Sequence, residues 1–123
     1  MQLMLYESKD DENGKKLVGA VQKALPNQPI GVFRQLPPMQ ERLRTPVEPN
    51  SIAILSVVDQ AELQRLQALR ELLTDLFVIL VVPDCKESTI RLAHLLLPRF
   101  ISPKDGSYSN LKEVLKKIVH TVH

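Results

Sequence analysis

The chain has 123 residues, of which 44% are hydrophobic and 24% are charged, so it fits one domain spanning residues 1–123 with a single core. Its net charge of +2 is too small for a nucleic-acid-binding face, and its one cysteine, Cys85, excludes an internal disulfide and favours a reducing, cytoplasmic setting. No apolar stretch approaches the roughly 18 residues that a membrane-spanning helix needs, and the start of the chain lacks the basic and apolar regions of a signal peptide.

Five short apolar runs alternate with helical patterns along the chain. The runs predict strands at 3–6, 30–33, 52–58, 76–82 and 100–101. Apolar residues at helical spacing predict helices at 15–25, 36–43, 59–73, 84–97 and 111–122. The runs at 52–58 and 76–82 are almost uniformly apolar, which is typical of central strands covered on both faces.

This alternation of strand and helix predicts an α/β fold with a five-stranded parallel sheet and helices on both faces. We expect a flavodoxin-like (βα)5 three-layer sandwich with the strand order 2-1-3-4-5. In such a sheet, ligands and chemistry gather at the carboxyl ends of the strands. The residues that follow each strand therefore decide what the domain can do.

Those strand ends carry Glu7 and Ser8 after the first strand, Ser56 in the third, and Lys104 after the fifth. In length, strand spacing and its apolar third and fourth strands, the chain resembles the receiver domain of two-component response regulators over essentially its whole length. The resemblance implies a site in which two acids hold Mg²⁺, an Asp ending the third strand accepts a phosphoryl group, and a Lys-Pro pair ends the fifth strand.

Carried onto this sequence, the motifs of that site are largely missing. Glu7 matches one acid of the pair, but Ser8 replaces the other, and Ser56 falls where the phosphorylated Asp belongs. Pro103 and Lys104 hold the Lys-Pro pair in reversed order. The resemblance therefore implies a degenerate receiver, or pseudo-receiver: a signalling and protein-interaction module that has lost aspartyl phosphorylation, is not an enzyme and needs no cofactor.

Asp59, just beyond the third strand, keeps a second interpretation open. It can be an atypical phosphoacceptor, with Mg²⁺ held near Glu7 by Asp10 or Asp11. It can also be the N-cap of the next helix, because Glu62 stands three residues later, as in a capping box. We expect the cap, and Mg²⁺ is a cofactor only under the alternative.

The partner of such a module is another protein, and the resemblance implies an interaction face on the fourth helix, fifth strand and fifth helix. On this sequence that face draws on Arg91, His94, Arg99, Tyr108 and Lys112. His94 lies on the apolar side of its predicted helix, so we expect it to be partly buried. A homodimer through this face is an open alternative, and we expect neither nucleic acid nor a membrane as partner.

A third alternative is a small ligand-binding or enzymatic flavodoxin-like domain that uses the crevice at the strand ends. The four glycines are too widely spaced for a glycine-rich phosphate loop, which counts against a nucleotide enzyme. A large polar pocket at Glu7, Ser56 and Pro83 would favour this alternative.

Overall fold

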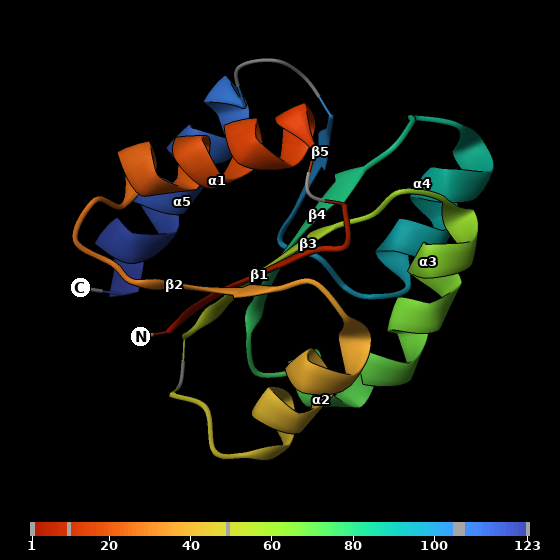
Figure 1. The fold of residues 1–123 in the computed structure, drawn as a ribbon, viewed down its shortest axis with the longest axis horizontal. Coiled ribbons are helices and arrows are strands. Elements are labelled where there is room, and N and C mark those ends of the chain that lie inside the picture. Colours follow the sequence, from red (N-terminus) through yellow and green to blue (C-terminus); the bar gives the residue numbers. More distant parts are fainter. Residues whose placement is uncertain (1, 10, 49, 105–107, 123) are drawn as a thin grey trace.

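The computed structural model describes residues 2–9, 11–48, 50–104 and 108–122. Along this part of the chain, five strands and five α-helices alternate (Figure 1). The strands are β1 (Leu3–Glu7), β2 (Ile30–Phe33), β3 (Ile52–Ser56), β4 (Phe77–Val82) and β5 (Phe100–Pro103). The helices are α1 (Glu12–Ala24), α2 (Leu36–Arg44), α3 (Gln60–Leu66), α4 (Glu87–His94) and α5 (Ser109–Val122), with a 3-10 helix η1 (Gln67–Leu73) after α3. None of the helices in these described residues is long and apolar enough to cross a membrane.

The strands form one parallel sheet in the order β2-β1-β3-β4-β5, which confirms the predicted flavodoxin-like α/β fold. Figure 1 shows α1 and α5 side by side on one face of the sheet and α2, α3 and α4 on the other. The strand order reverses between β1 and β3, because the chain first moves outward to β2 and then returns across β1. This reversal is the topological switch point of the sheet.

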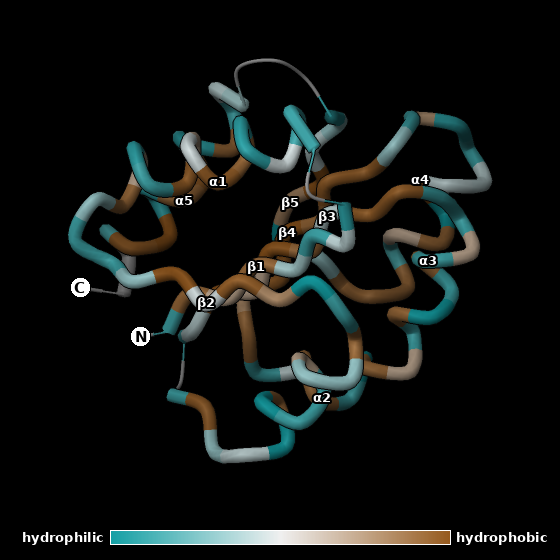
Figure 2. The backbone as a smooth tube through the Cα atoms, viewed as in Figure 1, coloured by the Kyte–Doolittle hydropathy of each residue, from teal (hydrophilic) through white to brown (hydrophobic). Residues whose placement is uncertain are grey.

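Two apolar clusters, one on each face of the sheet, hold the three layers together. Successive residues of β1 alternate between them: Leu3 and Leu5 pack under α1 and α5, whereas Met4 and Tyr6 pack under α2, α3 and α4. Figure 2 shows hydrophobic residues along the strands and on the sides of the helices that face the sheet. The same alternation directs Glu7, the last residue of β1, toward α1 and α5.

The helix predicted at 59–73 is two helices in the structure, α3 followed by the 3-10 helix η1. Gln67 stands at the junction, where its Nε2 donates a hydrogen bond to the carbonyl of Leu92 in α4 at 3.0 Å. Leu66, Leu69 and Leu73 are buried on either side of the junction. Apolar spacing therefore predicts which residues are buried here. It does not predict the change from α-helix to 3-10 helix, which coincides with the hydrogen bond from Gln67 to α4.

The helix predicted to run to residue 97 ends at His94. Leu96 then fills the buried place at this end, while Leu97 adopts a φ of 54° and is 70% exposed. His94 is exposed, so the prediction that it is partly buried is wrong. The physical reason is that His94 and Ile90 line an open groove between α4 and the edge strand β5, so this side of the helix is not covered.

Candidate functional site

The carboxyl ends of β1 and β3 place Glu7 and Ser56 next to each other. The two residues are direct partners in the parallel register, and both side chains point toward the α1 and α5 face. Glu7 is 1% exposed and Ser56 is 0% exposed. Glu7 Oε2 and Ser56 Oγ have no hydrogen-bond partner among the described residues. A phosphoryl donor in solution therefore has no open path to either oxygen.

The first turn of α1 covers Glu7. Asp11 caps this helix, since its Oδ1 accepts a hydrogen bond from the N–H of Gly14 at 2.8 Å. A Cβ on Gly14 would lie 3.1 Å from Glu7 Cδ and 3.0 Å from the carbonyl oxygen of Lys9, so glycine permits the close approach of the helix. The Lys9 N–H donates to Glu7 Oε1 at 3.0 Å and holds the carboxylate beneath this turn.

Ser8 and Lys104, the other two residues of the expected site, do not bring their side chains to the unpartnered oxygens of that buried pair. Ser8 is half-buried and lines a crevice beside α2 and α3, on the opposite face of the sheet. Lys104 follows β5, where its backbone N–H donates to the carbonyl of Val82 at 3.2 Å. The unpartnered oxygens of Glu7 and Ser56 take no hydrogen bond from the side chain of either residue.

Asp59 is the N-cap of α3, as the capping interpretation predicts. Its Oδ1 accepts a hydrogen bond from the N–H of Glu62 at 2.8 Å. Glu62 does not close the capping box onto Asp59. Instead its Oε1 accepts from the N–H of Val58 at 3.0 Å, and its Oε2 accepts from the hydroxyl of Tyr6 at 3.0 Å.

The proposed magnesium ligands are not assembled in the part of the chain that the structure describes. Asp11 is occupied as the cap of α1, and Asp10 lies outside the described residues. Within the described ranges no three His, Cys, Asp or Glu side chains form a group that could hold a metal ion. Glu7 is therefore the one candidate ligand placed at the strand ends of this part of the chain.

Most residues of the predicted interaction face reach the surface. Arg91, His94 and Arg99 are exposed, and Lys112 is half-buried. Arg91 forms an ion pair of 2.7 Å with Glu87, one helical turn away. The guanidinium of Arg99 lies 5.3 Å from the centroid of the Phe77 ring.

Tyr108 lies inside the protein, and the structure corrects its assignment to this face. The residue is 0% exposed and packs in the cluster between the sheet, α1 and α5. Its hydroxyl donates to Asn13 Oδ1 in α1 at 2.7 Å. A φ of 53° accompanies this inward placement just before α5, which apolar spacing does not predict.

An apolar groove of about 360 Å³ lies between α4 and β5. It is lined by Val82, Ile90, His94, Phe100, Ile101 and Pro103, among others. β5 is an edge strand of the sheet, so no further strand covers its outer side. Leu95 and Leu97, which are 48% and 70% exposed, extend apolar surface at the adjoining end of α4.

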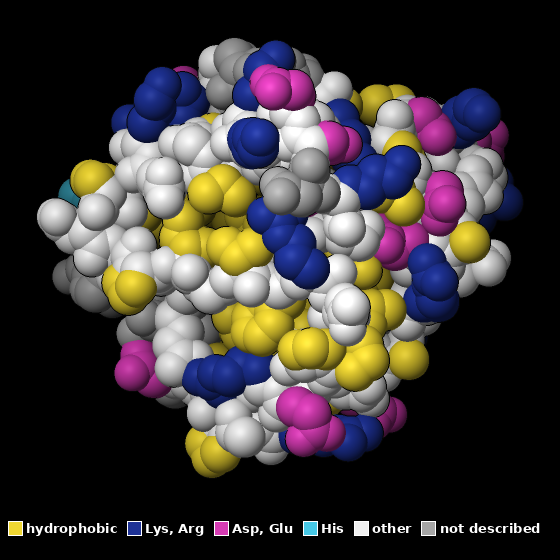
Figure 3. Space-filling view, viewed as in Figure 1, with side chains coloured by type: hydrophobic (Ala, Val, Ile, Leu, Met, Phe, Trp, Pro, Cys, Tyr) yellow, Lys and Arg dark blue, Asp and Glu magenta, His cyan; other side chains and the backbone are white. Residues whose placement is uncertain are grey.

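The opposite edge of the sheet, β2, also exposes apolar surface. Val32 is 40% exposed, and a smaller hollow of about 230 Å³ lies beside it over Gly31 and Phe33. Figure 3 shows hydrophobic side chains gathered where β2 crosses the face in view, between α1 and α2. Because β2 and β5 are both edge strands with exposed apolar residues nearby, a variant at Val32 can serve as a control for variants beside the groove at β5.

A polar crevice of about 490 Å³ lies at the switch point of the sheet, on the α2 and α3 face. Its walls come from the segments that follow β1, β2 and β3: Ser8, Arg34, Gln35, Val58 and Arg65, with the hydrogen-bonded pair Tyr6 and Glu62. A polar pocket at Glu7, Ser56 and Pro83 would favour a ligand-binding domain, whereas the crevice in the structure lies on the other face. Alternation along β1, which separates Tyr6 from Glu7, is the sequence signal that indicates this face.

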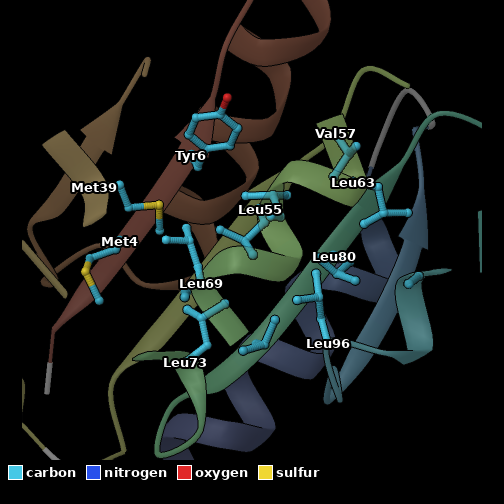
Figure 4. Packing of buried hydrophobic residues seen from close by; sticks show 14 of the residues in the cluster. Met4, Tyr6, Met39, Leu55, Val57, Leu63, Leu69, Leu73, Leu80 and Leu96 are labelled. Atoms are coloured by element: carbon cyan, nitrogen blue, oxygen red, sulfur yellow. The ribbon is translucent and has the colours of Figure 1, made fainter. Parts of the chain in front are cut away.

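Tyr6 connects this crevice to the core. Figure 4 shows Tyr6 at the edge of the apolar cluster, with its hydroxyl directed away from Met4 and Met39. Burial, followed by the neighbouring Glu62 carboxylate, raises the pKa of Tyr6 to about 12. The phenol therefore stays protonated at neutral pH and donates to Glu62.

Comparison with known proteins identifies the fold. No protein-family model matches the sequence, and no curated protein matches it. The structure is similar to the 2.50 Å crystal structure of a protein from Burkholderia pseudomallei described as pilus assembly-related, with a TM-score of 0.72 and 17% identity over 98% of this chain and 90% of that chain. At this identity the likeness shows the fold alone, which is consistent with the receiver-like domain that the sequence resembles.

Proposed function

We propose that this domain is a non-enzymatic protein-interaction module of the signalling type, built on a receiver-like scaffold that has lost aspartyl phosphorylation. The observation that carries the proposal is the open apolar groove between α4 and β5, in a domain whose strand ends are closed on the α1 and α5 face, where Glu7 and Ser56 lie. The partner we propose is an acidic, partly apolar segment of another protein.

The burial of Glu7 and Ser56 at the strand ends supports the loss of phosphoryl chemistry. An acyl phosphate forms on a carboxylate, whereas Ser56 offers a buried hydroxyl at that place. Glu7 is covered by the first turn of α1, and Asp59 already accepts the hydrogen bond that caps α3. Among the described residues, Glu7 and Asp59, the carboxylates that follow or end β1 and β3 here, thus both have structural roles.

Leu97 supports a contact function for the groove. An L-residue in the left-handed region costs about 1–2 kcal/mol, and glycine or asparagine is the usual residue there. Leu97 adopts a φ of 54° and leaves most of its apolar side chain in water. An exposed leucine held at such a cost beside an apolar groove indicates a surface that another protein covers.

The charges around the groove favour an acidic partner over a second copy of the chain. The segment from residue 84 to residue 104, which contributes most of the groove, has four Lys or Arg residues and one His but only two acids. The basic residues are Lys86, Arg91, His94, Arg99 and Lys104, and the acids are Asp84 and Glu87. Of these, His94 lines the groove itself, and Arg99 lines a separate hollow beside α5. A symmetric dimer through this face would bring two segments of net positive charge together, which costs free energy. The pilus-assembly description of the Burkholderia protein is in keeping with a role in protein contacts.

Site-specific photo-crosslinking tests the proposal. A photoreactive residue at position 97, beside the groove, is compared with one at Val32, on the exposed edge at β2. We expect a crosslink to one partner from position 97 and none from position 32. The identified partner is then purified, and Leu97→Asp and His94→Glu should weaken its binding at least tenfold while Val32→Asp leaves it unchanged. A crosslink of equal strength at both positions, a homodimer, or binding unaffected by Leu97→Asp would overturn the proposal.

Amide NMR with Mg²⁺ and then beryllofluoride tests the loss of phosphorylation separately. We expect no saturable shifts at Glu7, Ser56, Asp59 or Lys104. Saturable shifts that cluster at these residues would mean a working phosphoryl site and would restore Asp59 as an atypical phosphoacceptor.

A further inference from the structure

The crevice at the switch point stands apart from the groove at β5 and has the features of a ligand site. In open α/β sheets, ligands bind outside the carboxyl ends of the strands where the strand order reverses. The crevice occupies this place, since its walls come from the residues that follow β1, β2 and β3. Its volume of about 490 Å³ lies within the range of small-molecule pockets, which is about 300–1,000 Å³.

Two guanidinium groups from different elements line this crevice. Arg34, just after β2, donates from Nη1 to the carbonyl oxygens of Glu7 at 3.3 Å and Lys9 at 3.4 Å, which fixes it beside the end of β1. Arg65 comes from α3 on the opposite wall and is exposed. Guanidinium groups bind phosphate oxygens through paired hydrogen bonds, so two of them can hold one phosphate from both sides.

The start of α2 adds further positive potential. Gln35, its N-cap, makes no side-chain cap hydrogen bond, and its side chain lines the crevice together with Leu36 and Pro37. The N-terminus of a helix carries partial positive charge and attracts anions. This contribution supplements the two arginines.

Glu62 is the acid in the wall, and its carboxylate is committed to the protein. One oxygen accepts from the Val58 N–H and the other from the Tyr6 hydroxyl, and the side chain is buried. The oxygens of Glu62 therefore do not depend on a ligand for their partners.

We propose that this crevice binds the phosphate group of a small ligand between Arg34 and Arg65. The phosphate lies against the two guanidinium groups, and the apolar wall of Leu36, Pro37 and Val58 takes the remainder of the ligand. This site is independent of the protein-interaction groove, which lies between α4 and β5 at the far edge of the sheet.

Amide NMR titrations at constant ionic strength test the site, with inorganic phosphate, AMP and adenosine as probes. We expect AMP to give saturable shifts at Ser8, Gln35 and Val58, and adenosine to give none. Equal binding of inorganic phosphate would identify the free ion as the ligand, and binding of AMP alone a phosphate monoester. Either result supports the proposal.

Arg65→Gln should weaken AMP or phosphate binding at least tenfold, while Arg70→Gln, an exposed arginine of η1 that does not line the crevice, should change it less than twofold. Arg65 is the better test because Arg34 also holds the end of β1. Linear, non-saturating shifts, equal binding by Arg65→Gln, or equal binding of adenosine would overturn the proposal. None of these results bears on partner binding at α4 and β5.

Discussion

Gly14 of α1 lies directly against the side chain of Glu7, so closely that a methyl group on residue 14 would come within 3.1 Å of Glu7 Cγ and Cδ. This contact seals the end of β1 on the α1 and α5 face. It explains why the one acid that matches the receiver motif is buried in the protein and not open to a cation. The polar side chains that remain accessible at the strand ends lie on the other face of the sheet, in the crevice around Tyr6 and Glu62.

A methyl group introduced at Gly14 should therefore lower stability, unlike one at Gly19 in the same helix. Gly14→Ala meets Glu7 and the backbone carbonyl of Lys9, whereas nothing lies within 4 Å of a Cβ at Gly19. Gly19→Ala should raise the free energy of unfolding by about 0.5–1 kcal/mol through helix propensity. Gly14→Ala should lower it by about 1 kcal/mol. Urea denaturation of both variants checks this, and equal gains at the two positions would contradict the close contact.

Restoring a carboxylate at position 56 should destabilise the fold without restoring phosphorylation. Ser56→Asp places a charge beside buried Glu7, with a cost of about 3 kcal/mol or more. Ser56→Ala removes a hydroxyl that has no partner among the described residues, and should raise the free energy of unfolding by about 1 kcal/mol. Urea denaturation measures both changes, and labelling with acetyl phosphate should leave Ser56→Asp unmodified. Labelling of this variant would show that the strand ends are accessible.

Sequence periodicity predicts much of this architecture because it records which side chains are buried. It gives the strand order through the βα alternation, and it gives the Asp59 cap because capping depends on residues three apart. It fails where the backbone turns into the left-handed region, as at Leu97 and Tyr108. At Leu97 the predicted helix has already ended, and the residue is exposed. Tyr108, which the receiver resemblance places on the interaction face, is buried.

The crevice at the switch point could not be predicted from the sequence, for a different reason. Tyr6 and Glu62 are 56 residues apart, and their hydrogen bond depends on how α3 docks against β1. The arginines in its walls come from a loop and a helix with no shared motif. Local sequence patterns do not predict which residues of distant elements come close together in the fold. Alternation along β1 does place Tyr6 and Glu7 on opposite faces of the sheet.

Asp59 should behave as a helix cap and not as a phosphoacceptor. Asp59→Ala removes the acceptor for the Glu62 N–H and should lower the free energy of unfolding by about 1 kcal/mol. Asp59→Asn keeps a capping oxygen and should lie within a few tenths of a kcal/mol of the natural chain. Urea denaturation separates the two. If acetyl phosphate labels the natural chain but not Asp59→Asn, Asp59 accepts a phosphoryl group, and the prediction that it acts only as a helix cap is wrong.

Tyr6→Phe should remove both a buried hydrogen bond and a pH dependence. Loss of the hydroxyl leaves Glu62 Oε2 without its donor and should lower the free energy of unfolding by about 1–3 kcal/mol at neutral pH. The pKa of Tyr6 is raised from 10.0 to about 12 in the folded state, so folding holds this proton more tightly. The associated stability is complete below pH 10 and is lost as the pH rises to about 12.

The comparison for this prediction is Tyr108→Phe, which removes the other tyrosine hydroxyl of the chain. Urea denaturation across the window from pH 10 to about 12 should show a steeper loss of stability for the natural chain and Tyr108→Phe than for Tyr6→Phe. The other ionisable groups are the same in the natural chain and in Tyr6→Phe, so their contributions cancel in the difference. An equally steep loss in Tyr6→Phe would assign the pH dependence to another group.

Leu97→Gly should raise stability while weakening partner binding. Relief of the left-handed conformation should raise the free energy of unfolding by about 1–2 kcal/mol. The greater backbone entropy of glycine in the unfolded chain should lower it by about 0.5–1 kcal/mol. The net gain in the free energy of unfolding is about 0.5–1 kcal/mol, since the side chain that is lost is mostly exposed. The same change removes apolar surface beside the groove, so the crosslinked partner should bind more weakly. A variant that gains stability and keeps full affinity would mean that Leu97 is strained for a reason unrelated to partner contact. The expected opposition between stability and binding would explain why a leucine occupies a position that glycine fits better.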